Sequence, residues 1–210
     1  MISSNFLRFL ERGLFAFGVG CLVFYAAACS HGSWFQFQAR AEFERELDAV
    51  IHAEDHDHSA WSKARRQHFS RLVGTPVQAL GRLEVPNAKL SVMLLEGTDE
   101  STLNRAVGHI EGTALPGERG NVGIAGHRDS FFRGLAQLEQ GDELSVTTLE
   151  GVAHYQVARL EVVEPTAVEV LDPTEHEALT LVTCYPFYYV GDAPQRFIVH
   201  AKQVRFDRWK

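Results

Sequence analysis

The 210-residue sequence has only three cysteines and no cluster of basic residues. The formal net charge is −7, and the pair Arg65-Arg66 is the densest basic spot. Because nucleic-acid backbones are held by clustered lysine and arginine, we expect no nucleic-acid partner. Hydrophobic residues make up 45% of the chain and charged residues 22%, which are ordinary globular values that exclude wholesale disorder.

Charge is absent from residues 13–39, and the segment 13–30 reads GLFAFGVGCLVFYAAACS. At 1.5 Å per residue, a helix of about 18 residues reaches about 27 Å, close to the hydrocarbon thickness of a bilayer. Trp34 and Phe35 follow this segment, where aromatic residues meet the membrane interface. The pattern predicts a transmembrane segment.

Arg8 and Arg12 precede the segment, which favours a cytoplasmic N-terminus and an extracytoplasmic remainder, in a single-pass protein of the plasma or inner membrane. The length suits one globular domain with an appendage. The expected divisions are a short cytoplasmic N-terminus, a transmembrane signal anchor, a helical stalk or linker, and one catalytic domain, at residues 1–12, 13–35, 36–75 and 76–210.

Two other interpretations of the apolar segment remain. A signal peptide could be cleaved at Ala26-Ala27-Ala28, and Ala28-Cys29 resembles a lipoprotein processing site without its upstream leucine. The apolar run is longer than the core of a usual signal peptide, which favours the uncleaved anchor. Each alternative exports the domain.

Cys21 and Cys29 fall within the apolar segment, so Cys184 is the only thiol of the expected exported domain. It therefore has no disulfide partner there. A lone thiol of this kind is either a buried hydrophobic residue or a reactive group, and the count alone leaves both possibilities open.

Residues 40–73 carry apolar side chains at helical spacing, which predicts a helical stalk. The segment 51–59, IHAEDHDHS, interrupts it. Its histidines and aspartates could bind a divalent metal such as zinc or copper, but nothing nearby fixes a coordination geometry. A solvated linker is therefore favoured, and we expect no metal.

From Pro76 onward, short alternating apolar runs are separated by glycine, proline and aspartate. Eight such runs predict a mostly β domain closed as a barrel, with two short helices, one capped by Thr98 or Asp99 and the other by Asp129 or Ser130. The candidate strands are residues 77–85, 89–96, 121–127, 143–150, 153–163, 167–171, 178–184 and 196–204.

The strand 178–184 ends on Cys184 and is followed by Tyr185-Pro186, which places the thiol at a strand terminus that a substrate can approach. His127 ends another apolar strand and could supply the imidazole that activates a thiol. Arg196 opens the next strand and could stabilise an oxyanion beside Cys184. Each residue has a plain structural interpretation alone, but together they favour a catalytic site.

Three motifs carry a resemblance to the sortase family, and most to its class D members: TLVTC followed by YPF at 180–187, AGHRDSFF at 125–132 and APQRF at 193–197. The segments EGTDESTL, GHIEGTALPGERGN and GDELSV resemble the family in the same order. The likeness extends from about residue 76 to residue 206, nearly all of the expected exported domain.

This resemblance implies an eight-stranded sortase-type barrel and a cysteine transpeptidase without a cofactor. Cys184 would attack the carbonyl after the threonine of an LPxTG-like sorting signal, and an amine from a peptidoglycan precursor or another protein would resolve the thioester. His127 would act as general acid and base, and Arg196 would steady the oxyanion. Thr183 and Tyr185, which flank the nucleophile, are expected to contact substrate.

Other functions remain open at this point. A cysteine endopeptidase would release the same acyl group to water, although no papain-like CGSC segment surrounds Cys184. The chain could also be an exported peptide-binding module, or a metal binder centred on residues 51–58. Asp99 and Glu100 are adjacent acids, but no acidic cluster clearly reproduces the calcium site of some sortases. His109 and His200 are expected to make local contacts.

Overall fold

The computed structural model describes residues 4–51, 79–188 and 191–209. Within the N-terminal helix, side chains are described for residues 12–23, 25 and 33–48. The segment 51–59, for which both a linker and a metal site were considered, lies outside the described side chains.

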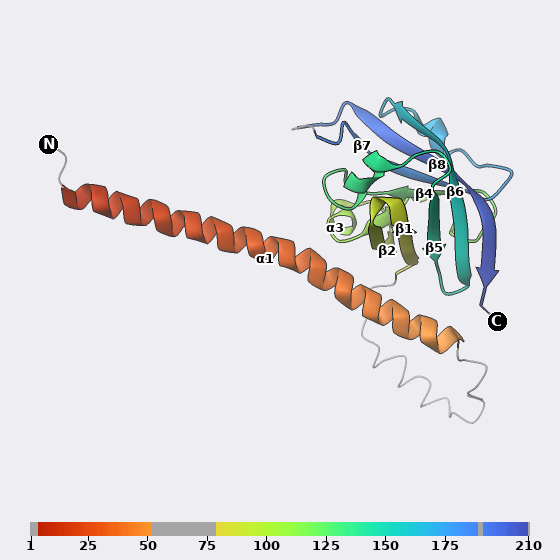
Figure 1. Cartoon of the computed structure of the whole chain (residues 1–210), viewed down its shortest axis with the longest axis horizontal. Coiled ribbons are helices and arrows are strands. Elements are labelled where there is room, and N and C mark those ends of the chain that lie inside the picture. Colours follow the sequence, from red (N-terminus) through yellow and green to blue (C-terminus); the bar gives the residue numbers. More distant parts are fainter. Residues whose placement is uncertain (1–3, 52–78, 189–190, 210) are drawn as a thin grey trace, which may run out of the picture.

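Eight strands form a closed barrel in the order β1-β2-β3-β4-β7-β8-β6-β5 (Figure 1). The pairs β2–β3 and β4–β7 are parallel, and the other pairs are antiparallel. The prediction of a mostly β, eight-stranded barrel is confirmed. The strands are β1 (Gly81–Val85), β2 (Leu90–Glu96), β3 (Val107–His109), β4 (Asn121–Ala125), β5 (Glu143–Thr147), β6 (Gly151–Val163), β7 (Ala178–Tyr185) and β8 (Gln195–Arg208).

Short helices occupy the connections: η3 (Pro86–Ala88), α3 (Glu100–Leu103), η4 (Phe131–Gln137) and η5 (Val168–Leu171). Asp99 caps α3, because its carboxylate accepts hydrogen bonds from the Ser101 and Thr102 amides. Ser130 precedes η4 without a side-chain cap. The predicted helix starts are therefore close to the observed ones, and both helices are short.

Two strand predictions differ from the structure. The predicted strand 167–171 is instead the short helix η5 at residues 168–171, and Val168 is 71% exposed, so the apolar alternation there does not reflect a buried sheet face. The short strand β3 was not predicted. Gly108 lies at its centre against the Gly97 carbonyl, where a Cβ atom has no room, and glycine is a poor indicator of a strand.

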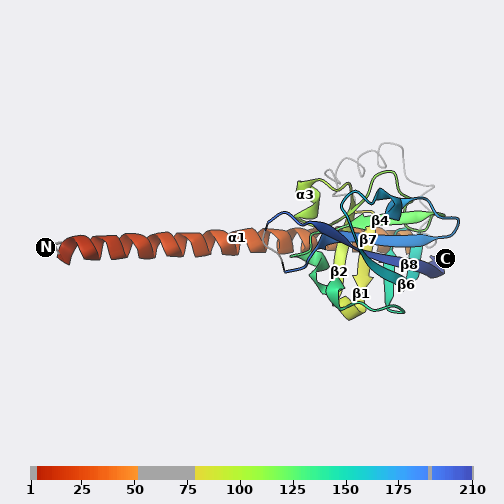
Figure 2. The same ribbon diagram turned by 90° about the horizontal axis from the view of Figure 1, so that it is seen from above.

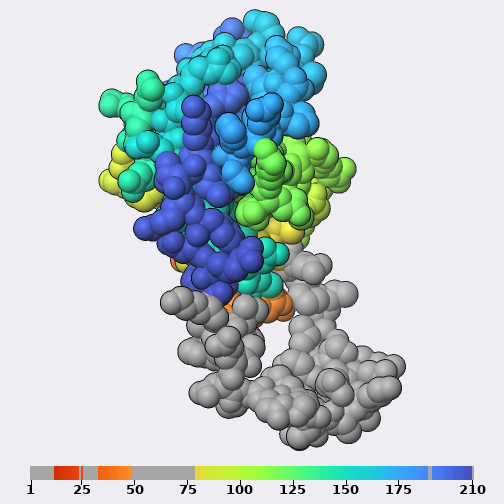
Figure 3. Space-filling view, turned by 90° about the vertical axis from the view of Figure 1, so that its right-hand side faces the viewer, coloured from red at the N-terminus to blue at the C-terminus, as the bar shows by residue number. Residues whose placement is uncertain are grey.

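The barrel interior is filled by alternate side chains from all eight strands. Phe132 and Leu135 of η4 are fully buried and close this core at the rim where β4 ends. Figure 3 shows another face of the barrel, where β8 lies beside the light-blue segment that connects β6 to β7.

The helix α1 (Ser4–Ile51) packs against the barrel through its C-terminal part, and its N-terminal part extends away from the barrel (Figures 1 and 2). Ala39 and Phe43 are buried in a second apolar cluster with Met93, Leu95 and other barrel residues. The Gln36 side chain accepts a hydrogen bond from the Met93 amide at 3.1 Å. Apolar burial and specific polar contacts therefore hold this part of α1.

Among the described residues, no helix combines the length and apolar composition of a membrane span. The predicted anchor, residues 13–35, lies within α1, and its positions 24 and 26–32 lie outside the described side chains.

Candidate active site

Cys184 lies near the C-terminal end of β7, at one rim of the barrel. Leu179, Leu181 and Thr183 are buried on the inner face of this strand. Because successive side chains of a strand point to opposite faces, Cys184 points outward, and it is half-buried. The thiol therefore combines a rigid strand position with access from outside.

Arg196 lies directly opposite Cys184, because β7 and β8 are antiparallel and these two residues are register partners. Opposed residues of such a pair have Cβ atoms about 4.5–5.5 Å apart. The Arg196 Nη1 atom donates to the carbonyls of Ala193 at 3.3 Å and Gln195 at 3.0 Å. The strand register thus places Arg196 beside Cys184.

His127 follows β4, which runs parallel to β7 with Ala125 beside Val182. The Gly126 amide continues this pairing by donating to the Val182 carbonyl at 3.2 Å. His127 lies two residues beyond Ala125, just as Cys184 lies two residues beyond Val182. Because neighbouring strands are about 4.8 Å apart, the register brings the half-buried imidazole to the same rim as the thiol.

The chain turns sharply after His127. The His127 carbonyl accepts hydrogen bonds from the Phe132 amide at 3.1 Å and the Ser130 amide at 3.4 Å. A Cβ atom on Gly126 would lie 2.8 Å from the buried Phe132 ring, so glycine lets this ring pack over the strand end. This glycine and aromatic ring therefore set the path of the backbone at His127.

Thr183 and Tyr185, the two predicted substrate contacts, have different environments. The Thr183 side chain is 2% exposed, and its hydroxyl donates to the Gly126 carbonyl at 2.7 Å. It therefore links β7 to the backbone before His127 instead of facing a peptide. The half-buried Tyr185 ring stacks on Phe197 and meets Phe187 edge-on, so it joins an aromatic cluster beside the thiol.

Arg128 was not among the predicted site residues. Its guanidinium donates to the Pro186 carbonyl at 3.3 Å and to the Gly191 carbonyl at 2.8 Å, both in the connection that follows Cys184. The sequence signals for this arginine are its position next to His127 and its place in the motif AGHRDSFF, but neither identifies its partners, which lie far along the chain. It connects the segment that begins with His127 to the chain that follows Cys184.

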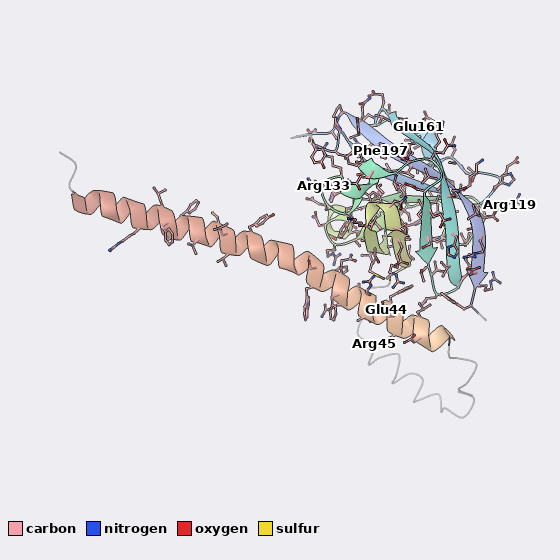
Figure 4. All side chains as sticks on the ribbon, in the orientation of Figure 1. Glu44, Arg45, Arg119, Arg133, Glu161 and Phe197 are labelled. Atoms are coloured by element: carbon pink, nitrogen blue, oxygen red, sulfur yellow. The ribbon has the colours of Figure 1, made fainter. Side chains whose placement is uncertain are left out.

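A cavity of about 690 Å³ lies on the outer face of β7 and β8, below the segment that contains η5. Thr180, His200 and Glu161 contribute to its wall, and Glu161 is labelled in Figure 4. Thr180 lies on the same face of β7 as Cys184, four residues or about 13 Å along the strand. The wall of this cavity therefore ends four residues before the thiol on the same strand.

Two histidines away from Cys184, His109 and His200, make local contacts, as predicted. His109 is buried, with Nδ1 3.1 Å from the Glu96 carboxylate and Nε2 3.0 Å from the Ala114 carbonyl. The His200 Nε2 atom lies 2.8 Å from the Glu161 carboxylate. Across the described residues, no three metal-ligating side chains converge.

A thiol, an imidazole and a guanidinium at one rim are the groups that acyl transfer through a cysteine requires. The sortase domain model matches residues 83–204, which include all three. Sortase D of Bacillus subtilis is 38% identical over 128 residues, which cover 60% of this chain and 65% of that protein. Sortase A of Listeria monocytogenes is 28% identical over 109 residues, which cover 50% of this chain and 49% of that protein.

Solved structures agree with the sequence matches. A Clostridium perfringens Sortase D5 transpeptidase superposes with a TM-score of 0.62 at 25% identity, covering 81% of this chain and 99% of that chain. Sortase E1 from Streptomyces coelicolor, solved with a tripeptide in its active site, gives a TM-score of 0.57 at 32% identity and covers 63% of this chain and 92% of that chain. The matches span less than two thirds of the curated relatives above. From its domain match and its barrel, this chain belongs to the sortase family, with class D proteins among its relatives.

Proposed function

We propose that this protein is a cysteine transpeptidase. It cleaves an LPxTG-like sorting signal and joins the new carboxyl end to an amine, as in cell-surface anchoring or pilin assembly. The observation that supports this most strongly is the strand register, in which Cys184 faces Arg196 on β8 and His127 follows the adjacent strand β4. Its partners are proteins with a C-terminal sorting signal, and the acceptor is a peptidoglycan precursor or another protein.

In the first half-reaction, the Cys184 sulfur attacks the carbonyl carbon after the threonine of the signal, and the thiol proton moves to His127. A tetrahedral intermediate forms, and the Arg196 guanidinium stabilises its oxyanion. The carbon–nitrogen bond then breaks, and His127 returns the proton to the leaving amine. The product is a thioester on Cys184 and a released C-terminal peptide.

In the second half-reaction, the acceptor amine attacks the thioester carbonyl, and His127 removes its proton. The carbon–sulfur bond breaks, the proton returns to the sulfur, and an amide joins the two substrates. A covalent thioester suits transfer because it divides one difficult step into two easier ones. The outer face of β7 and its adjacent cavity offer an extended peptide a surface along the strand.

Incubation of the protein with a sorting-signal peptide, with and without an added amine, tests this proposal by mass spectrometry. We expect an amide product that contains the amine, and no turnover by Cys184→Ala. Cleavage that never incorporates the amine would instead identify a cysteine endopeptidase. Binding of the peptide without cleavage would identify a peptide-binding module, and both results contradict a transpeptidase.

We also propose that the protein is a single-pass membrane protein, with residues 13–35 as an uncleaved anchor and the barrel on the extracytoplasmic side. Support comes from the charge-free segment and from the arginines that precede it. The barrel contacts of α1 involve residues from Phe35 to Leu47, so the barrel would lie close to the end of the proposed span.

Alkaline carbonate extraction and protease treatment of intact cells test this topology. We expect the full-length chain in the membrane pellet and the barrel accessible from outside. Release of the protein into the alkaline supernatant would contradict the anchor. A mature N-terminus at residue 27, 28 or 29 would contradict it as well, because the segment would then have been cleaved. These experiments are independent of the catalytic assay.

A further inference from the structure

The chain that follows Cys184 leaves the strand ladder and connects β7 to β8. Tyr185 is the last β7 residue, paired with Gln195, and Pro186 has no amide hydrogen to continue the ladder. Phe187 and Tyr188 lie in a turn directly after this strand end. Side-chain interactions add to this turn in determining where the chain lies beside the thiol.

Three arginine side chains supply such interactions. Arg128 donates to the carbonyls of Pro186 and Gly191, and Arg196 donates to the carbonyls of Ala193 and Gln195. The Arg133 guanidinium lies over the exposed Tyr188 ring, 5.4 Å from its centroid, and Figure 4 labels Arg133. Two of these arginines belong to the segment that begins with His127.

Arg128 differs from the other two in what it joins. It is the next residue after His127, and its two carbonyl acceptors lie two and seven residues after Cys184. Because one half-buried side chain joins the His127 segment directly to the chain after Cys184, a displacement of either segment affects the other. Arg196 bonds only to the chain immediately before itself and makes no comparable bridge to the His127 loop.

We propose that Arg128 is a positioning residue for catalysis. By tying the loop of His127 to the chain beyond Cys184, it holds the imidazole and the thiol in the relative geometry that proton transfer needs. This inference rests on the proposed transpeptidase function. Displacements of about 1 Å at a reacting centre are sufficient to reduce rates strongly.

Arginine suits this role better than lysine. Its planar guanidinium presents donors in a fixed fork, and here Nη1 and Nη2 reach two different carbonyls. A lysine ammonium on a flexible stem can keep the charge and one of these bonds, but it does not hold both carbonyls at a set separation. Arg128→Lys should therefore retain only part of the positioning that the arginine provides.

Arg119 provides a matched control. Its Nε atom donates to the Glu175 carbonyl at 2.8 Å, so it also links two loops through a side chain-to-backbone bond. It precedes the N-terminal end of β4, whereas Arg128 follows the C-terminal end. Figure 4 shows Arg119 on the opposite side of the barrel from Arg133.

The test compares kcat and KM for amine transfer in Arg128→Ala, Arg128→Lys and Arg119→Ala. Because hydrogen bonds to charged groups are among the stronger ones, we expect Arg128→Ala to lower kcat by about 10- to 100-fold, with a smaller change in KM. The kcat of Arg128→Lys should lie between those of Arg128→Ala and the wild type. Arg119→Ala should stay within about twofold of wild type, as is usual for surface substitutions.

A second readout does not need turnover. Iodoacetamide alkylates Cys184, and the dependence of this rate on pH reports how the imidazole acts on the thiol. The Arg128→Ala profile should move toward that of His127→Ala, while Arg119→Ala keeps the wild-type profile. If the wild type transfers no acyl group, the transpeptidase proposal fails, and the alkylation profile still tests the role of Arg128.

Wild-type kcat and an unchanged alkylation profile in Arg128→Ala would overturn the proposal. An equal loss of kcat in Arg119→Ala would overturn it too, because the effect would then not depend on the His127 loop. Thermal unfolding separates folding from positioning. If Arg128→Ala and Arg128→Lys both lose the native transition, the arginine is required for the fold and the positioning role is rejected.

Discussion

Replacing Thr183 by valine removes one hydroxyl beside the nucleophile and keeps the shape of the side chain. In the wild type, this hydroxyl donates at 2.7 Å to the carbonyl of Gly126, the residue before His127. Both residues are buried, so water cannot replace the missing donor. The substitution therefore leaves a buried carbonyl without its partner and loosens the backbone that carries the candidate base.

The expected loss of stability follows from this burial. A buried polar group that loses its partner costs about 1–3 kcal/mol. In a chain of this size, each kcal/mol lowers the Tm by about 2–4 °C, so we expect a fall of about 2–12 °C. Activity should fall further than stability explains, because the carbonyl is one residue from His127.

Thr148→Val is a matched control. The buried Thr148 hydroxyl donates to the Gly151 carbonyl at 3.2 Å in the turn between β5 and β6, which holds none of the candidate catalytic residues. We expect both variants to lower the Tm, but only Thr183→Val to lower kcat at a temperature where both are folded. Calorimetry and the amine-transfer assay measure the two effects separately.

Three results would refute this reasoning. An unchanged Tm in Thr183→Val would mean that the hydroxyl bond contributes nothing to the fold. A rise in KM with normal Tm and kcat would restore the sequence-based expectation that Thr183 contacts substrate. Equal losses of kcat in the two threonine variants would attribute the effect to general destabilisation.

The remaining predictions concern the packing of α1 and the cap of α3. Phe43 is 1% exposed between α1 and the barrel. Phe43→Ala should therefore lower the free energy of unfolding, measured by urea denaturation, by about 3–5 kcal/mol. A loss of less than about 1 kcal/mol would show that α1 does not pack there in solution. Hydrogen bonds from Ser101 and Thr102 lower the pKa of Asp99 to about 2 from 3.8. The ionised cap therefore stabilises the fold fully above about pH 4, and this stabilisation is lost as the pH falls through about 2. The stability difference between wild type and Asp99→Ala should therefore shrink on acidification, and a difference that grows instead would contradict the assignment.

Alternating apolar residues were sufficient to predict most of the barrel. Strands β6, β7 and β8 lie where the pattern placed them, because each has one face in the core. The same rule failed at η5, where Val168 and its neighbours alternate without a sheet partner. It also missed β3, a three-residue strand with a glycine at its centre, whose existence depends on its neighbours β2 and β4.

The sequence predicts the site residues that lie at strand ends, because strand ends can be located from the apolar pattern. The sequence suggested that Cys184 and Arg196 face each other, because the two strands are consecutive and antiparallel, and the register bears this out. The positions of Thr183 and Arg128 were not predictable. Their partners come from the parallel pairing of β4 with β7, and Gly126 and Thr183 are 57 residues apart in the chain.

This parallel pairing explains why side chain-to-backbone bonds matter at the site. It brings the C-terminal ends of β4 and β7 to the rim where β8 begins, so the candidate base, nucleophile and cation all lie at strand ends. A strand end offers access to a peptide, but the hydrogen-bond ladder stops there and restrains the chain less. The bonds of Thr183 to Gly126 and of Arg128 to Pro186 and Gly191 restore this restraint just beyond the ladder. We therefore expect the geometry of His127 and Cys184 to depend on these two side chains more than on additional strand pairing.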